Sequence, residues 1–368
     1  MTEYCLVSIA AAGLSFALTP YFRTLAFRIG AIDHPGERRV HRVATPRLGG
    51  PVILLAMVAS MVLGSLLDEG VAGFLSSDAH RRAWLAVGAL TVTSIGAVDD
   101  VHALSPRTKL LVEAVAALAV THGGFRFEHF AGYPLNLLAL PVTVVFVVAA
   151  TNAFNLVDGL DGLAAGLSLI IGATLMVLGW GGRDSLVLVA LCGALIGFLP
   201  YNRHPARIFL GDSGALLLGF MIGIGAVSTS HQLFGADALV APALALGLPM
   251  LELLLTASRR ILRAMPLFTA DSDHIHHRLL ALGLGQRNAV LILYAVGASF
   301  CALALILPHL DDALIFPLLA TVMACSLAGA RMLGYRRELQ PLRTTLAPMR
   351  MPIENAEPAR LQIHTLEP

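Results

Sequence analysis

Charged side chains are scarce in this sequence. They make up 13% of its 368 residues, whereas a typical soluble domain has about 25%, and hydrophobic residues make up 57%. A soluble domain, an intrinsically disordered chain and a nucleic-acid-binding tail would each need more charge, so the composition excludes all three. The sequence is that of an integral membrane protein, in which the position of each charge says more than the net charge of +1.

Lysine and cysteine are also rare. The 25 basic residues are all arginine except Lys109, and the four cysteines lie far apart within apolar runs. Four such cysteines are too few for a disulfide framework, and we expect them to be small buried side chains. No basic residue precedes the first apolar run, which we therefore interpret as a retained span rather than a cleaved signal peptide.

Long apolar runs dominate the chain, and a transmembrane helix needs about 20 such residues. Eleven candidate spans are predicted, at residues 4–22, 50–67, 84–98, 109–121, 135–150, 163–180, 185–200, 214–230, 238–256, 289–307 and 313–330. The sequence thus predicts an all-α, polytopic integral membrane protein with about eleven transmembrane helices over residues 1–335. A polar cytoplasmic tail, residues 336–368, is expected to be disordered.

The arginines predict the orientation of these spans. Only Arg81, Arg82, Arg126 and Arg183 fall on one side of the arrangement, and all other basic residues fall on the opposite side. Basic residues near span ends stay in the cytoplasm. We therefore expect a multi-pass protein of the cell (inner) membrane, with its N-terminus outside and its C-terminus inside.

Five aspartates lie at span ends on the predicted cytoplasmic side. Asp99 and Asp100 follow the third span, Asp158 and Asp161 precede the sixth, and Asp212 precedes the eighth. A single aspartate at a span end would only mark the water interface. Five of them in Gly- or Asn-rich sequence indicate a functional site.

Two of these segments have further features. TNAFNLVDGLDGLAAG, residues 151–166, carries amide and carboxylate side chains at every third position: Asn152, Asn155, Asp158 and Asp161. Gly159 and Gly162 argue against a regular helix there, and the next helix should begin near Gly162 with free N–H groups that can bind an anion. GDSG, residues 211–214, is typical of a helix N-cap and is equally compatible with metal binding.

Histidines gather in one long interior loop. DSDHIHHRLL, residues 271–280, brings His274, His276, His277 and Arg278 together. Zinc is one interpretation, but no Cys lies nearby and no second His pair has metal spacing. Contact with a diphosphate uses His and Arg together and is the preferred interpretation. A second basic loop, residues 32–50, contains His41.

These features fit one kind of chemistry. Clustered carboxylates suit a hard cation, with Mg²⁺ the first choice and Mn²⁺ an alternative. Basic loops suit phosphate groups. Because both are predicted at the cytoplasmic membrane surface, they suit transfer of a phosphoryl-linked group from a soluble nucleotide to a lipid.

Five motifs in this order carry a resemblance: DHPGERRVH…PRLGG, GAVDDVHALSPRTKLL, NAFNLVDGLDGL, PARIFLGDSG and DSDHIHHRL. They run from Asp33 to Leu280, about two thirds of the chain. Together they resemble the polyprenyl-phosphate N-acetylhexosamine-1-phosphate transferases, and the histidine motif is more similar to the N-acetylglucosamine branch than to the muramoyl-pentapeptide branch. The resemblance implies transfer of N-acetylglucosamine 1-phosphate from a UDP-sugar to undecaprenyl phosphate, with release of UMP, as the first membrane step of cell-envelope glycan synthesis.

The resemblance also implies roles for individual residues. Catalytic roles are implied for Asp99, Asp100, Asp158, Asp161 and His276. Substrate contacts are implied for Asn152, Asn155, Phe209, His274, His277, Arg278 and His41, with Phe209 packing on the uracil. Asp212 and Asp100 are the implied Mg²⁺ ligands.

Several alternatives stay open. The same chemistry could use another UDP-sugar, such as a muramoyl-pentapeptide or a modified N-acetylhexosamine. A cation or metabolite transporter is the alternative from another class, although transporter sites usually lie near the membrane midplane between repeats. The expected partners are the UDP-sugar, the polyprenyl phosphate and the membrane, without nucleic acid. The sequence leaves a homodimer open, as well as the choice between direct attack and a covalent aspartyl intermediate.

Overall fold

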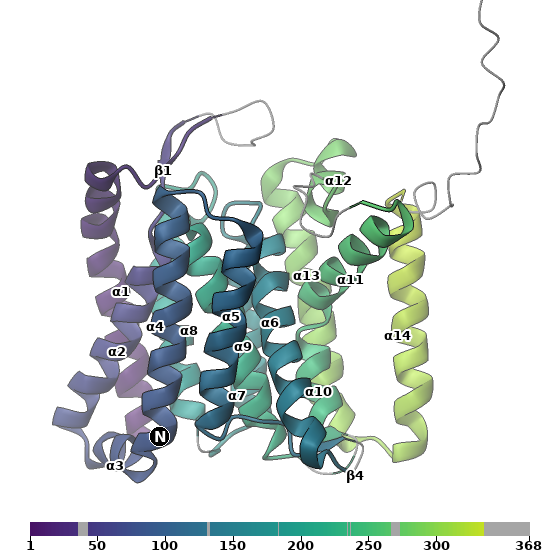
Figure 1. Cartoon of the computed structure of the whole chain (residues 1–368), viewed down its shortest axis with the longest axis horizontal. Coiled ribbons are helices and arrows are strands. Elements are labelled where there is room, and N and C mark those ends of the chain that lie inside the picture. Colours follow the sequence, from purple (N-terminus) through teal and green to yellow (C-terminus); the bar gives the residue numbers. More distant parts are fainter. Residues whose placement is uncertain are drawn as a thin grey trace, which may run out of the picture.

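The computed structural model describes residues 1–35, 43–130, 133–182, 184–233, 235, 237–265 and 273–334. Within these residues the chain is helical almost throughout, and most helices lie side by side along one direction (Figure 1). The α-helices are α1 (Thr2–Ile29), α2 (Gly49–Leu67), α3 (Glu69–Ser77), α4 (Ala79–Val101), α5 (Pro106–His122), α6 (Ala139–Val157), α7 (Leu163–Leu178), α8 (Ser185–Asn202), α9 (Gly211–Ser230), α10 (Asp237–Ala245), α11 (Gly247–Leu262), α12 (Ile275–Ala281), α13 (Gln286–Ile306) and α14 (Asp312–Met332). The predicted all-α fold is confirmed.

The remaining regular structure described is short. Two 3₁₀ helices, η1 (Asn136–Leu138) and η2 (Leu307–His309), adjoin α6 and α13. Strand β1 (Ile32–Asp33) pairs antiparallel with β2 (Thr45–Pro46), and β3 (His129–Phe130) pairs antiparallel with β4 (Tyr133–Pro134). The two hairpins lie at opposite ends of the bundle (Figure 1).

The eleven predicted spans all fall on helices. Eight helices of the described residues are long and apolar enough to cross a membrane, and α10 with α11, bent by 79° at their junction, would make a ninth. The other two segments form α5 and α7, which have 17 and 16 residues. The chain is a polytopic membrane protein, while the count of eleven and the sides of the termini stay predictions. The predicted tail, residues 336–368, lies outside the described residues.

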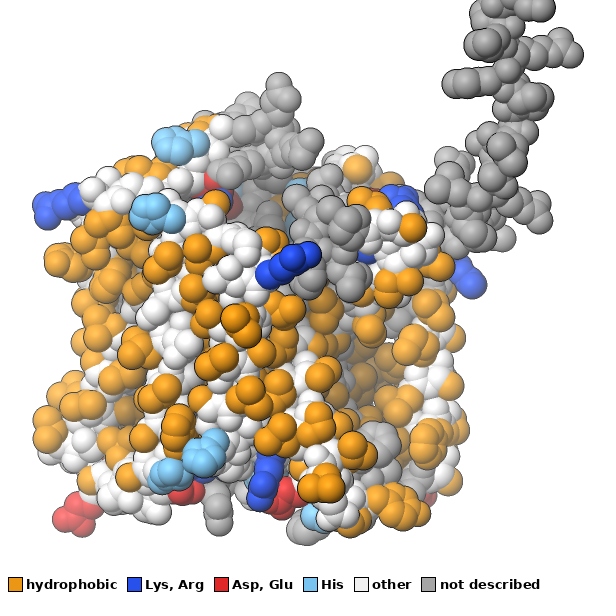
Figure 2. Space-filling view, in the orientation of Figure 1, with side chains coloured by type: hydrophobic (Ala, Val, Ile, Leu, Met, Phe, Trp, Pro, Cys, Tyr) orange, Lys and Arg blue, Asp and Glu red, His pale blue; other side chains and the backbone are white. Residues whose placement is uncertain are grey.

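Helix α9 lies at the centre of the bundle. All of its residues are buried except Asp212, and it packs against α2, α4, α6, α7 and α10. On the face shown in Figure 2, hydrophobic side chains instead cover most of the lateral surface, and charged side chains gather toward the two ends. Because lipid solvates apolar side chains but not charges, this surface suits a bilayer.

Local sequence explains where α5 begins after α4 and where α6 ends. Ser105 caps α5 by accepting a hydrogen bond from the Thr108 N–H at 3.1 Å, and Pro106 stands at the first helical position, where its missing N–H does no harm. The turn between α4 and α5 is therefore tight. Helix α6 ends at Val157, directly before the glycine-containing segment 158–162.

Candidate functional site

Helix α4 contacts the first turn of α9 through Asp100. One carboxylate oxygen of Asp100 accepts the Asp212 N–H at 2.8 Å, and the other accepts the Ser213 N–H at 3.2 Å and the Ser213 hydroxyl at 2.8 Å. Gly211 permits this contact, because a Cβ there would lie 2.4 Å from the Asp100 carboxylate. The expectation that GDSG caps its own helix was wrong, since the capping carboxylate comes from α4.

Lys109 lies between two predicted site residues, Asp99 and Asp212. Its ammonium, on the first turns of α5, lies 2.9 Å from Asp99 Oδ2 and 2.6 Å from Asp212 Oδ2. The Lys109 side chain keeps only 20% of its exposure. The other oxygen of Asp99 accepts the Leu104 N–H at 2.6 Å, which holds the carboxylate against the turn between α4 and α5. A cation thus bridges carboxylates that are distant in sequence.

Helix α6 adds its two amides to this cluster. The Asn155 amide donates to Asp212 Oδ1 at 3.4 Å. Asn152, one turn earlier, donates to Val148 O at 2.9 Å and to the carboxylate of Glu113 on α5. Spacing by three residues places both amides on the α6 face that meets α5 and α9.

Segment 158–162 contains the two predicted aspartates Asp158 and Asp161, which lie in different surroundings. Burial and the nearby charges of Asp212 and Asp100 raise the pKa of Asp158 to about 8. Asp161 turns to a different partner, because its Oδ2 lies 2.8 Å from His204 Nδ1 and accepts the Ala206 N–H at 3.0 Å. Helix α7 begins at Leu163, as predicted.

Backbone hydrogen bonds of Phe209 connect the basic loop, residues 32–50, to the start of α9. Its N–H donates to Pro46 O at 2.8 Å, and the Gly49 N–H donates back to Phe209 O at 3.2 Å. Arg47 in the same segment forms an ion pair with Asp33 at 2.6 Å. The half-buried Phe209 ring therefore lies just before the first turn of α9. His41 lies outside the described residues.

The three histidines form a second polar cluster. The rings of His274 and His276 are stacked, with centroids 5.5 Å apart, and His276 and His277 are 4.4 Å apart. Glu252 of α11 lies 2.8 Å from His274 Nδ1. Arg278 forms an ion pair with Asp273 at 2.6 Å.

His276 connects this cluster to segment 158–162. A Cβ on Gly159 would lie 2.1 Å from His276 Nε2, so the ring packs directly on the glycine backbone. Burial, with the neighbouring His277 and His274, lowers the pKa of His276 to about 3, so the ring is neutral at physiological pH. Its buried Nε2 has no hydrogen-bond partner within the described part of the chain.

Comparisons with known proteins show the family to which this chain belongs. The model of glycosyl transferase family 4 matches residues 83–230. A probable undecaprenyl-phosphate N-acetylglucosaminyl 1-phosphate transferase of Bacillus subtilis is 36% identical over 299 residues, which cover 79% of this chain and 81% of that protein. The chain belongs to the polyprenyl-phosphate N-acetylhexosamine-1-phosphate transferase family.

Two further relatives represent both branches of this family. A decaprenyl-phosphate N-acetylglucosaminephosphotransferase of Mycobacterium tuberculosis is 36% identical over 324 residues, covering 80% of each chain. A phospho-N-acetylmuramoyl-pentapeptide-transferase of Desulforudis audaxviator is 31% identical over 345 residues, covering 81% of this chain and 97% of that protein. Of these relatives, the N-acetylglucosamine enzymes are the more similar, as the histidine motif predicted.

Sequence reasoning did not place three further residues at the candidate site, although each contacts a predicted site residue. Lys109 was the only lysine among arginines, and that rarity could have singled it out. Glu113 and Glu252 are acidic residues inside apolar runs, the usual signal of function at membrane depth. Each of them contacts a predicted residue, Asn152 for Glu113 and His274 for Glu252.

A divalent cation requires oxygen ligands, which the carboxylates of the cluster can supply. Among the described residues, no three His, Cys, Asp or Glu side chains are placed to hold a metal ion. Mg²⁺, however, usually takes one or two carboxylates, waters and substrate phosphates rather than an all-protein cage. Asp99 and Asp212 already hold a cationic group, the Lys109 ammonium, between them. Their oxygens fit Mg²⁺ in the presence of a diphosphate.

An apolar groove adjoins the histidine cluster. It has a volume of about 470 Å³ and is lined by residues of α11, α12, α13 and α14, among them Leu255, Ile275, Leu279, Val296 and Val322. Ile275 and Leu279 belong to the short helix that carries His276 and His277. Helix α14 forms the outer wall at the edge of the bundle (Figure 1).

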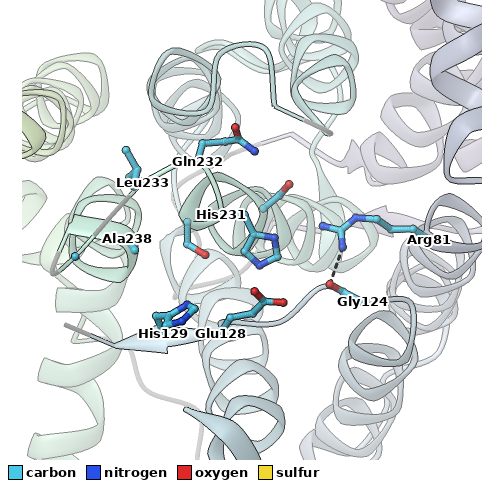
Figure 3. Close-up of a pocket in the computed structure, with 11 residues that line it drawn as sticks. Arg81, Gly124, Glu128, His129, His231, Gln232, Leu233 and Ala238 are labelled. Atoms are coloured by element: carbon cyan, nitrogen blue, oxygen red, sulfur yellow. Dashed lines mark hydrogen bonds between the residues drawn. The ribbon is translucent and has the colours of Figure 1, made fainter. Parts of the chain in front are cut away.

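A polar cavity of about 540 Å³ lies at the opposite end of the bundle, near the first turn of α4. Arg81 donates to Gly124 O at 2.6 Å and pairs with Asp184 at 2.9 Å. The His231 ring and the Glu128 carboxylate point toward one another across the cavity (Figure 3). None of the predicted site residues lines this cavity, so it is separate from the candidate site.

Proposed function

We propose that this transferase moves N-acetylglucosamine 1-phosphate from its UDP-sugar to a polyprenyl phosphate, with release of UMP. The observation that carries the proposal is the cluster in which Lys109, Asn155 and the carboxylates of Asp99 and Asp212 meet. It lies at one end of an apolar bundle, where a soluble diphosphate and a lipid headgroup can both arrive. The N-acetylglucosamine transferases among the relatives of this chain support the same sugar.

Asp212 is the residue proposed to hold Mg²⁺, and Asp99 is the second carboxylate that the Lys109 ammonium occupies beside it. When bound, the ion would neutralise charge on the donor diphosphate and stabilise UMP as the leaving group. Both carboxylate oxygens of Asp100 accept hydrogen bonds from the first turn of α9. We therefore propose that Asp100 positions Asp212 and contributes indirectly to metal binding. Asn152, Asn155, Asp158, Asp161 and Phe209 are proposed to contact or shape the nucleoside diphosphate site.

The acceptor is proposed to approach from the apolar groove. Because that groove ends at α12, a prenyl chain in it brings its phosphate toward the histidine cluster and segment 158–162. Asp99 orients the lipid phosphate or removes its remaining proton. His274, His276, His277, Arg278 and His41 are proposed to contact the diphosphate and the sugar.

The chemical step is written as direct displacement. An oxygen of the lipid phosphate attacks the phosphorus that bears the sugar, and the bond from that phosphorus to the UMP oxygen breaks. Both sugar and phosphorus pass to the lipid. A phosphate monoester already carries a negative oxygen near neutral pH, so an aspartyl intermediate would add a step without an evident need.

The test is UMP release by the purified protein in detergent with polyprenyl phosphate, Mg²⁺ and a panel of UDP-sugars. Release with UDP-N-acetylglucosamine, absent without lipid, is the expected result. Asp212→Asn should reduce turnover by orders of magnitude at limiting Mg²⁺, while Asp68→Asn, at the N-cap of α3, should not. No UMP with any UDP-sugar would contradict the function.

Two further measurements address mechanism and orientation. A stoichiometric burst of UMP from delipidated protein, lost in Asp99→Asn, would overturn direct displacement in favour of a covalent intermediate. The active site is proposed to face the cytoplasm of the inner membrane, because nearly all basic residues fall at that end. Labelling of a single Cys at position 272 from outside intact cells would contradict this orientation.

A further inference from the structure

Helix α11 carries a polar face inside the protein. Glu252, Thr256 and Arg259 recur at i, i+4 and i+7, the spacing of one helix face, and each is at most 2% exposed. Leu251 and Leu255, from neighbouring positions of the same helix, line the apolar groove. One helix therefore separates the groove from a buried polar layer.

Glu252 makes three contacts across that face. Its Oε1 lies 2.8 Å from His274 Nδ1 and accepts the Thr256 hydroxyl at 3.3 Å. Its Oε2 accepts the Ile275 N–H at 3.0 Å. Arg259, about one turn beyond Thr256, donates to Asp273 O at 2.6 Å. The face thus holds both the backbone and the first histidine of the segment that begins the histidine motif.

The contact between Glu252 and His274 also determines which ring nitrogen of His274 carries the proton. A carboxylate only accepts hydrogen bonds, so Nδ1 of His274 must carry the proton. In the neutral ring Nε2 is then the acceptor. The ring is 8% exposed and stacks on His276, whose own ring packs on Gly159. A change at Glu252 therefore reaches segment 158–162 through two stacked rings.

We propose that Glu252 is a positioning residue of the transfer reaction, which orients the histidine cluster by holding His274 in one ring orientation and one tautomer. The inference rests on the proposed function for its kinetic readout. A merely structural role would require only that a buried carboxylate has partners. The positioning role requires that Glu252 acts through His274.

Glu252→Gln is the informative variant, since it keeps size and one acceptor but places an amide against the ring. Misplacement of a contact group by about 1 Å can cost roughly 10²-fold, and we expect turnover to fall by about that factor. Binding of UMP, measured by calorimetry, should change far less, because UMP lacks the sugar and the second phosphate of the diphosphate that the histidines are proposed to contact. Glu69→Gln, the same change on an exposed carboxylate of α3, is the matched control.

A double-mutant cycle decides whether Glu252 acts through His274. If it does, Glu252→Gln should add little to the loss already caused by His274→Ala. Additive losses would overturn the proposal, and so would wild-type turnover in Glu252→Gln. A lowered melting temperature alone, without the non-additivity, would also overturn it by showing a structural role.

An activity-independent measurement separates this inference from the proposed function. Nitrogen-15 NMR of ¹⁵N-histidine-labelled protein, with His274→Ala to assign the signal, should show His274 protonated at Nδ1 in the wild type and altered in Glu252→Gln. An unchanged His274 signal would overturn the positioning role. A wild-type protein that shows this tautomer but releases no UMP would instead contradict the proposed function alone.

Discussion

Replacement of Lys109 by Gln is the most discriminating test of the carboxylate cluster. The variant removes the cation that lies 2.9 Å from Asp99 and 2.6 Å from Asp212. Hydrogen bonds to charged groups contribute about 1.5–3 kcal/mol each, and the lower value applies because the Lys109 and Asp212 side chains keep 20% and 27% of their exposure. Two such contacts give about 3 kcal/mol, which Mg²⁺ must overcome to take the two carboxylates from the ammonium; at about 1.36 kcal/mol for each factor of ten, this is roughly 10²-fold in Mg²⁺ affinity.

The assay is UMP release at saturating donor and lipid while Mg²⁺ is titrated. We expect the Mg²⁺ concentration at half-maximal rate to fall by up to roughly 10²-fold in Lys109→Gln, because Asp99 and Asp212 no longer have to release an ammonium. Arg107→Gln, which removes an exposed cation two residues earlier, is the control and should resemble the wild type. An unchanged or raised Mg²⁺ requirement in Lys109→Gln would refute the reasoning.

Three other substitutions test single contacts. Asp100→Asn removes one strong acceptor from the first turn of α9 and should lower the free energy of unfolding by about 1–3 kcal/mol, as seen in detergent melts. Gly159→Ala should displace His276 and raise the activation free energy by about 1.4 kcal/mol or more, which reduces turnover more than tenfold. Gly73→Ala, where a Cβ meets nothing within 4 Å, is the control and should leave turnover unchanged. The raised pKa of Asp158, about 8 against an ordinary 3.8, means that its contribution to stability is present at low pH and lost as pH rises through 8. Asp158→Asn in chelator should therefore match the wild type near pH 4 and unfold at higher temperature than the wild type at pH 9; equal melting at pH 9 would contradict this.

The sequence was sufficient for the helical architecture, and it singled out several polar residues that the fold brings together. Apolar runs separated by Gly- or Arg-rich breaks located every span segment on a helix, because length and hydropathy are local properties. Asp99, Asn155 and Asp212 were found because amides and carboxylates at span ends are costly without a purpose. Segment order and glycines likewise predicted the start of α7 near Gly162.

What the sequence could not supply were contacts across helices. The division of labour between Asp99 and Asp100 depends on which carboxylate faces the first turn of α9. The pairing of Glu252 with His274 depends on how α11 runs after its 79° bend from α10, and no local pattern encodes that angle. Asp161 looked equivalent to Asp158, yet packing turned it toward His204.

The single lysine of the chain has a practical consequence for chemical labelling. Amine-directed acylating reagents have two sites to modify, the terminal amino group and Lys109. Lys109 is held between two carboxylates, so its acylation rate reports how often the ammonium leaves them. A ligand or ion that takes over Asp99 and Asp212 changes that rate, and mass spectrometry of one peptide then reads occupancy of the site without an assay of turnover.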